Sequence, residues 1–228
     1  MSRIRSSLAM IVPVVVGLSA AAGVSAAAAP APSSVLQSDQ TWSGSFDSAL
    51  MGASVASAGD VNSDGFDDVV VGAPGFDAPG GLFDEGAAFV FLGSANGVVG
   101  NNPATAHAVI VSSDAGAEFG NSVDGAGDVN GDGYDDIIVG APLENSSSLS
   151  TAGAAYVFLG GPAGITARKP ADAQYKMESK QIEGHLGRTV AGAGDVNRDG
   201  FADVVVTAEP AVDREDEFSS GAPTMMSS

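Results

Sequence analysis

The sequence predicts an all-β protein assembled from repeated units of short strands. A nine-residue acidic segment occurs three times, and the steps between its copies, which start at Asp60, Asp128 and Asp195, are 68 and 67 residues. Each copy is followed by three β-branched residues and soon by a proline, which is typical of a short strand covered on both faces. The 31 glycines and the 16% of charged residues also suit short strands joined by tight turns.

The first 41 residues are expected to lie outside the repeats. Residues 1–29 resemble a secretory signal peptide, because two arginines precede an apolar run over residues 8–22 and small residues at 24–26 offer a cleavage site. The apolar run is short and no basic stop signal follows it, which argues against a membrane anchor. Residues 30–41 would then be a flexible leader. We therefore expect a secreted or extracytoplasmic protein with no membrane association after cleavage.

The rest of the chain divides into three repeats. In each repeat a short segment bounded by glycine leads into the acidic loop, and the β-branched run leads out of it. The loop therefore joins two predicted strands. The period places the repeats at residues 42–106, 107–174 and 175–228, the last of them partial and with a truncated tail.

Two further strands are predicted after the first loop and two after the second. Aromatic-rich segments predict a third strand at residues 86–93 and 153–160. Residues 107–111 predict a fourth strand, and residues 175–177 are a weaker equivalent. Four strands in a unit of about 67 residues, with no strong helical segment, is the pattern of a β-propeller blade.

The third unit is predicted to be incomplete. Its third strand should begin near Gly221, but Pro223 and the lack of aromatic residues disfavour a strand there. Three blades, the last cut short, are fewer than the roughly four to eight that close a propeller. We expect an incomplete propeller, either as a fragment of a longer one, which we favour, or as part of a ring completed by other copies of the chain.

The three acidic loops predict calcium sites. In each loop, positions 1, 3, 5 and 9 carry side-chain oxygens, position 7 offers a backbone carbonyl, and glycine at position 6 permits the turn. An EF-hand would need a glutamate at position 12 and flanking helices, whereas position 12 here is a valine in a predicted strand. The candidate ligands are Asp60, Asn62, Asp64, Phe66 and Asp68; Asp128, Asn130, Asp132, Tyr134 and Asp136; and Asp195, Asn197, Asp199, Phe201 and Asp203.

The charge distribution supports this interpretation. The net charge is −19, and eleven of the 28 acidic residues lie in the three loops. Two carboxylates 4 Å apart repel by about 4 kcal/mol at an effective dielectric near 20, so up to three structural calcium ions should stabilise the fold. Only nine lysines and arginines are present, which disfavours nucleic acid as a partner. No cysteine is present, which excludes disulfides and thiolate metal sites.

The segment Phe119–Pro142 resembles the FG-GAP repeat found in the propeller of integrin α chains and in many secreted bacterial proteins. In the first unit Met51 replaces the phenylalanine, and in the third Leu186 replaces it while Thr207–Pro210 replaces Gly-Ala-Pro. The resemblance covers most of residues 42–210. It implies a seven-bladed propeller with calcium loops on one face, of which this chain would hold fewer than half the blades.

Two functions remain open. The resemblance to integrin α propellers implies adhesion, that is, binding to a protein, glycan or matrix ligand, with calcium in a structural role. The alternative is an accessory or remnant domain of a secreted hydrolase or polysaccharide lyase. The sequence lacks the Gly-x-Ser-x-Gly, His-Glu-x-x-His and phosphate-binding Gly-x-x-x-x-Gly-Lys motifs, so no catalytic residue is nominated and His107 and His185 are expected to be packing or surface residues. Self-association through the unfinished blade is a further expected interaction.

Overall fold

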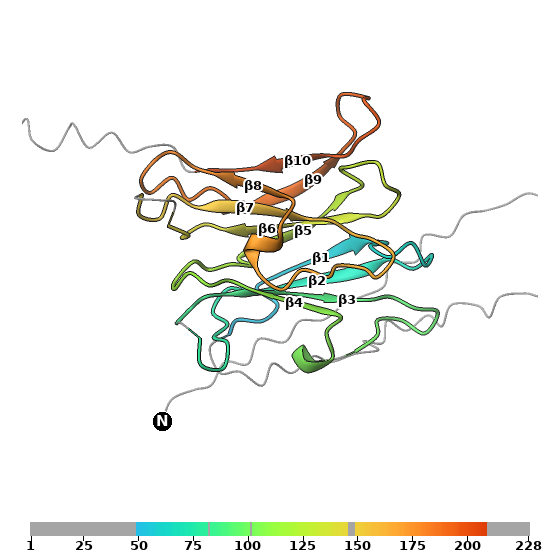
Figure 1. Cartoon of the computed structure of the whole chain (residues 1–228), viewed down its shortest axis with the longest axis horizontal. Helices are drawn as coiled ribbons and strands as arrows, with labels where there is room; N and C mark the ends of the chain where they lie inside the picture. The colour runs from blue at the N-terminus through green and yellow to red at the C-terminus, as the bar shows by residue number, and fades with distance from the viewer. Residues whose placement is uncertain (1–48, 82, 101, 146–148, 209–228) are drawn as a thin grey trace, which may run out of the picture.

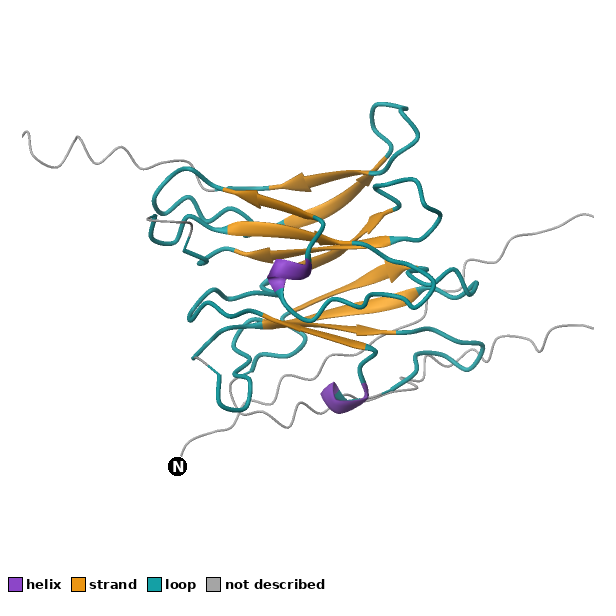
Figure 2. Cartoon of the chain, in the orientation of Figure 1, coloured by secondary structure: helices purple, strands orange, loops and turns teal. Residues whose placement is uncertain are grey.

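The computed structural model describes residues 49–208, apart from residues 82, 101 and 146–148. These residues form three antiparallel sheets stacked face to face (Figure 1), so the predicted all-β fold is confirmed. They contain no α-helix; two 3-10 turns, η1 (Pro103–Thr105) and η2 (Pro170–Asp172), lie in connections between strands (Figure 2). The predicted signal peptide, the leader and the segment near Gly221 fall outside the described residues.

The first two sheets are complete four-stranded meanders, in which consecutive strands are neighbours and every pair is antiparallel. The third and fourth strands predicted after the first and second loops are confirmed. The first sheet comprises β1 (Ser54–Gly59), β2 (Asp68–Ala73), β3 (Ala87–Phe91) and β4 (Ala108–Val111). The second comprises β5 (Ser122–Gly127), β6 (Asp136–Ala141), β7 (Ala154–Phe158) and β8 (Tyr175–Glu178).

The third sheet has two strands within the described residues, β9 (Val190–Gly194) and β10 (Asp203–Val206). In all three sheets the acidic loop connects the first strand to the second, as predicted. Position 12 of the loop lies inside the second strand, at Val71, Val139 and Val206, which confirms that these are not EF-hands. The sheets described here do not close into a ring.

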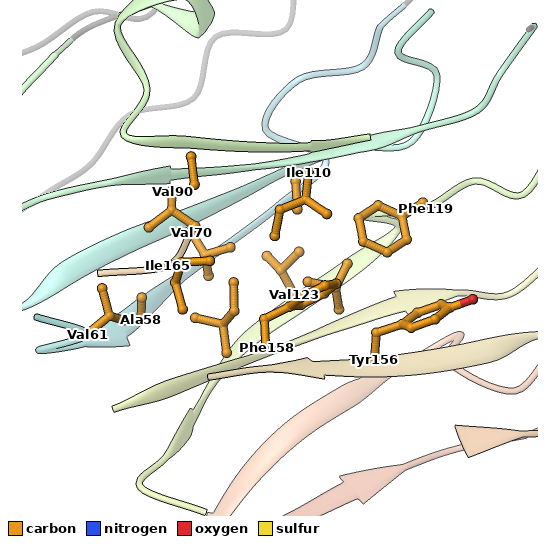
Figure 3. Packing of buried hydrophobic residues seen from close by; sticks show 14 of the residues in the cluster. Ala58, Val61, Val70, Val90, Ile110, Phe119, Val123, Tyr156, Phe158 and Ile165 are labelled. Atoms are coloured by element: carbon orange, nitrogen blue, oxygen red, sulfur yellow. The ribbon is translucent and has the colours of Figure 1, made fainter. Parts of the chain in front are cut away.

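The main core lies between the first two sheets (Figure 3). One face of the first sheet supplies Val70, Val90 and Ile110, which are fully buried. The facing side of the second sheet supplies Phe158, and Phe119 packs against it with ring centroids 6.2 Å apart. Alternate residues of β2, β3 and β4 therefore face the second sheet, as the two-residue period of a strand requires.

Burial on both faces, predicted for the strand after each loop, is found in two of the three units. Every residue of β6 is buried, because one face packs on the first sheet and the other packs on β9 and β10. In β2 all residues but Val69 are buried. In β10 Val205 is 51% exposed, so among the described residues this strand is covered on one face only.

Backbones touch at one corner of the stack, where glycine is required. A Cβ on Gly72, near the end of β2, would lie 1.9 Å from the carbonyl oxygen of Gly120, and a Cβ on Gly140 would lie 2.0 Å from that of Gly187. Real Cβ atoms do not approach backbone atoms so closely. The glycine of Phe-Gly in one unit thus lies against the glycine of Gly-Ala-Pro in the unit before. In the third unit Thr207 takes the place of the Gly-Ala-Pro glycine, which is Gly72 in the first unit and Gly140 in the second.

A polar cluster interrupts the apolar packing of the second sheet. Tyr156 donates its hydroxyl hydrogen to Glu144, and Lys176 Nζ lies 2.9 Å from Glu144 Oε1. Burial, together with the hydrogen bond to Glu144, raises the pKa of Tyr156 far above its ordinary value, so the tyrosine remains a neutral donor. In the first sheet Phe76 and Phe89 pack edge to face with ring centroids 5.5 Å apart. Phe76 and Phe89 occupy the positions in the first unit that correspond to Glu144 and Tyr156 in the second.

Candidate metal centres

The three acidic loops stand in a row along one side of the stack (Figure 1). Neighbouring loops are joined by backbone hydrogen bonds between position 8 of one loop and position 1 of the loop before it. The N–H of Asp135 donates to the carbonyl of Asp60 at 3.2 Å, and the N–H of Ala202 donates to the carbonyl of Asp128 at 2.9 Å. These backbone bonds hold neighbouring loops next to each other.

Each loop folds around the carboxylate at position 1. In the first loop the Asp60 carboxylate accepts hydrogen bonds from the N–H groups of Asp64, at 3.0 Å, and Gly65, at 2.8 Å. Asp128 and Asp195 accept the same two bonds in their own loops. The glycine at position 6 has φ of 91°, 90° and 95° in the three loops, a left-handed conformation that favours glycine.

Positions 3 and 5 are also brought together. The Asn62 side-chain oxygen accepts the N–H of Asp64 at 3.1 Å, and the Asn62 amide donates to the Asp64 carboxylate at 2.9 Å. The Asp64 carboxylate also accepts the N–H of Phe66, at position 7, at 3.0 Å. The same three contacts recur in the second and third loops, among Asn130, Asp132 and Tyr134 and among Asn197, Asp199 and Phe201.

Position 9 is the buried member of the set. Asp136 is fully buried and accepts the N–H of Val129, at 2.9 Å, and of Gly160, at 2.8 Å, so it joins the loop to the end of β7. Burial raises the pKa of Asp136 to about 6; the two backbone bonds oppose that shift, and the charges of Asp132 and Asp128 add to it.

Asp68 occupies the same position in the first loop. Its carboxylate accepts the N–H of Val61 at 2.9 Å and of Gly93 at 2.7 Å. Burial is the largest cause that raises the pKa of Asp68 above its ordinary value. In the third loop Asp203 accepts the N–H of Val196 at 2.9 Å, and no described strand follows β10 to supply a second donor.

The donor chemistry of the loops fits calcium. Each loop gathers three aspartates and one asparagine, which offer only oxygen ligands, and calcium prefers six to eight of these in flexible geometry. Among the described residues, no group of three acidic or imidazole side chains is arranged so as to hold a metal ion. The carboxylates are engaged instead with backbone N–H groups of the loop and with the asparagine at position 3.

Position 8 holds a contact that sequence reasoning missed. The Asp135 carboxylate accepts the N–H of Asp60, in the neighbouring loop, at 2.8 Å. Gly59 leaves room for this contact, since a Cβ there would lie 2.2 Å from Asp135 Oδ2. The available signal was the aspartate at position 8 in two loops, Asp67 and Asp135, which alanine replaces in the third.

Neither described histidine belongs to an acidic loop. His107 Nε2 lies 2.9 Å from the carbonyl oxygen of Ala163, where it joins the start of β4 to the connection after β7. His185 lies in the turn that opens the third unit, with φ of 44°.

A groove of about 610 Å³ lies between β8 and β10, lined in part by Val157, Met177 and Val204.

Comparison with known proteins agrees with the repeat pattern. The FG-GAP repeat model matches residues 51–91, 119–158 and 186–219. The chain is 38% identical over 165 residues, 65% of its length, to integrin alpha pat-2 of Caenorhabditis briggsae, and 31% identical over 176 residues, 76% of its length, to integrin alpha-5 of Xenopus laevis. It is also 33% identical over 165 residues, 71% of its length, to human phosphatidylinositol-glycan-specific phospholipase D.

The chain spans only 12%, 16% and 19% of the lengths of these three relatives. The family match nevertheless recurs in all three units and covers about half of the chain. It begins at or near the Phe-Gly position of each unit and takes in each acidic loop and the strand after it. On these grounds the chain belongs to the FG-GAP repeat family.

Proposed function

We propose that the protein is a secreted, calcium-stabilised binding module whose calcium ions are structural. The observation that carries this proposal is the same arrangement of oxygen-bearing side chains in three loops, each between the first two strands of a sheet. The integrin α chains among its relatives support a role in adhesion or protein binding. No described helix is long and apolar enough to cross a membrane.

The ligand positions explain why the ions would be structural. Positions 1 and 9 of each loop bracket the turn between two paired strands, and position 9 is hydrogen-bonded to the end of the third strand in the first two units. An ion held there would tie three strands together and offset the repulsion among the carboxylates. The residues Asp60 to Asp68 and their counterparts in the other two loops would supply the ligands named above.

Calcium is expected to stabilise the full chain against heat and urea. With dissociation constants of roughly 10⁻⁴ to 10⁻³ M, 10 mM calcium would add about 1–3 kcal/mol for each occupied site. Differential scanning calorimetry with calcium, with magnesium and with EDTA measures the effect. Magnesium is the control, because it demands a smaller and more regular site. No heat of calcium binding and no rise in Tm would refute the proposed calcium sites.

The third loop is expected to bind calcium most weakly. Among the described residues its position-9 carboxylate has one backbone donor where the other two have two, and its sheet has two described strands. Asp64→Ala, Asp132→Ala and Asp199→Ala each remove position 5 from one loop. The first two variants should lose more of the calcium-induced rise in Tm than the third. Equal losses in the three variants would contradict this ranking.

The ligand is proposed to be a protein, glycan or matrix component. Probing an array of such molecules with the calcium-loaded chain tests this proposal.

Self-association through the third unit also remains a proposal. Val205 on β10 is 51% exposed, which supports it. Sedimentation velocity over a range of concentrations distinguishes a monomer from a self-associating chain.

The accessory domain of a secreted hydrolase or lyase remains the alternative, since a phospholipase D is among the relatives. The polar cluster of Glu144, Tyr156 and Lys176 favours packing over chemistry, because Glu144 is only 7% exposed and Tyr156 packs against Phe119. Hydrolysis of glycans or phosphodiesters by the purified chain, with no binding on the array, would favour the enzyme alternative.

A further inference from the structure

The row of acidic loops is linked by a side chain that is not itself a candidate ligand. Asp135, at position 8 of the second loop, accepts the backbone N–H of Asp60, which is position 1 of the first loop, at 2.8 Å. Asp135 is half-buried between the two loops, and Asp60 returns a second contact because its carbonyl accepts the N–H of Asp135 at 3.2 Å. The two residues therefore form a closed pair of hydrogen bonds between loops.

This pair touches the ligand sets of both loops. The Asp60 carboxylate is folded onto its own loop by two N–H bonds, while its backbone is held by the second loop. Asp135 lies directly between Tyr134 and Asp136 in the sequence, both of which are proposed ligands of the second loop. Any change that orders Tyr134 and Asp136 would also order Asp135, and Asp135 in turn fixes the start of the first loop.

We propose that Asp135 is a positioning residue that couples the first two loops, so that calcium binding in one strengthens calcium binding in the other. This inference rests on the proposed calcium sites. Because coupling between two binding sites is reciprocal, occupation of either loop has the same effect on the affinity of the other. Ser63, whose hydroxyl donates to the carbonyl of Gly133 at 2.6 Å, adds a second, exposed contact between the loops.

The second and third loops lack this link. Position 8 of the third loop is Ala202, which keeps the backbone bond to the carbonyl of Asp128 at 2.9 Å but has no side-chain acceptor for the Asp128 N–H. Gly127, like Gly59, leaves space beside position 8: a Cβ on Gly127 would lie 2.9 Å from the Cβ of Ala202. The third loop is therefore expected to bind calcium independently of the other two.

The chain offers matched control variants. Asp67 is position 8 of the first loop, is exposed, and has no described loop before it, so Asp67→Ala removes the same charge without breaking a link between loops. Asp135→Asn removes the charge but keeps an oxygen that can accept the Asp60 N–H. Asp135→Ala removes both. Ala202→Asp supplies the missing acceptor in the third loop, in space that Gly127 keeps open.

The test uses the full chain titrated with calcium alone and followed by NMR. Gly65, Gly133 and Gly200 each donate an N–H to the position-1 carboxylate of their own loop, so each amide signal reports one loop. In the unmodified chain the Gly65 and Gly133 signals should change together. In Asp135→Ala the midpoint of the Gly65 change should move to a calcium concentration about fivefold higher, the low end of typical coupling between sites.

The remaining variants test whether the hydrogen bond of Asp135 or its charge couples the loops. Asp135→Asn should keep most of the coupling, Asp67→Ala should leave it unchanged, and Ala202→Asp should bring the Gly200 change toward that of Gly133. Hydrogen exchange of the Asp60 amide in EDTA gives a readout without calcium, and exchange should be faster in Asp135→Ala than in Asp135→Asn.

Three outcomes would overturn the inference. If calcium binds but Asp135→Ala leaves the Gly65 midpoint unchanged, the coupling role is wrong while the calcium sites stand. If Asp67→Ala or Asp135→Asn weakens binding as much as Asp135→Ala does, charge and not the hydrogen bond is responsible. If no amide responds to calcium, the proposed function and this inference fail together.

Discussion

Gly72→Ala is expected to force the first two sheets apart and to lower the free energy of unfolding by about 3 kcal/mol or more, as overpacking against a fixed backbone does. The new Cβ would lie 1.9 Å from the carbonyl oxygen of Gly120. That oxygen cannot easily retreat, because the N–H of Gly120 donates to the carbonyl of Gly140 at 2.9 Å. A Cβ on Gly120 itself would meet the carbonyl of Ala87 at 2.2 Å, so its backbone is enclosed.

Urea unfolding followed by far-UV circular dichroism measures this loss. Gly161→Ala is the matched control, since a Cβ at Gly161 meets no atom within 4 Å and its φ is not positive. We expect the control to stay within about 0.5 kcal/mol of the unmodified chain. If Gly72→Ala unfolds at the same urea concentration as Gly161→Ala, the close contact between the units does not determine the stability of the stack.

Asp136→Ala is expected to lower the free energy of unfolding by about 2–5 kcal/mol even without calcium, because two partly buried backbone N–H groups lose their acceptor. The groups are those of Val129, in the loop, and Gly160, after β7. Urea unfolding in EDTA at pH 7.5 measures the loss. That pH is above the raised pKa of about 6, so the carboxylate of the reference protein is ionised.

Asp203→Ala is the comparison for that experiment, since Asp203 accepts one described backbone bond from Val196 and is only partly buried. Its loss of stability should be clearly smaller. Asp132→Ala should also have a small effect in EDTA, because Asp132 is exposed, but it should lose much of the calcium response. A loss in Asp136→Ala no greater than that in Asp203→Ala would show that position 9 acts only through a bound ion.

The sequence was sufficient to predict the strands and the turns between them. The repeat period identifies the loop and its two flanking strands, which are found in all three units, and the two strands that follow, which are found in the first two units. The valine at position 12 also predicted correctly that the loop continues into a strand. These features are local, so the order of residue types along the chain determines them.

The contacts between units could not be predicted in the same way. Asp135 and Asp60 are 75 residues apart, and nothing in the spacing says that position 8 of one loop meets position 1 of the loop before it. The same holds for Gly72 and Gly120. The sequence shows that both glycines belong to the repeated motif, but not that their backbones contact each other. Glu144, Tyr156 and Lys176 were missed because the first unit has apolar residues at the matching positions, so the cluster does not recur with the period.

The close backbone contacts at Gly72 and Gly140 have a consequence for the spacing between the stacked sheets. Gly72 and Gly140 let each sheet approach the next until backbone meets backbone, which fixes the smallest separation between consecutive units. Thr207 takes the matching place in the third unit and carries a branched side chain there. Any polypeptide that packed on the outer face of β10 would therefore have to stand farther away at this corner, so the spacing that holds for the first three units cannot continue unchanged.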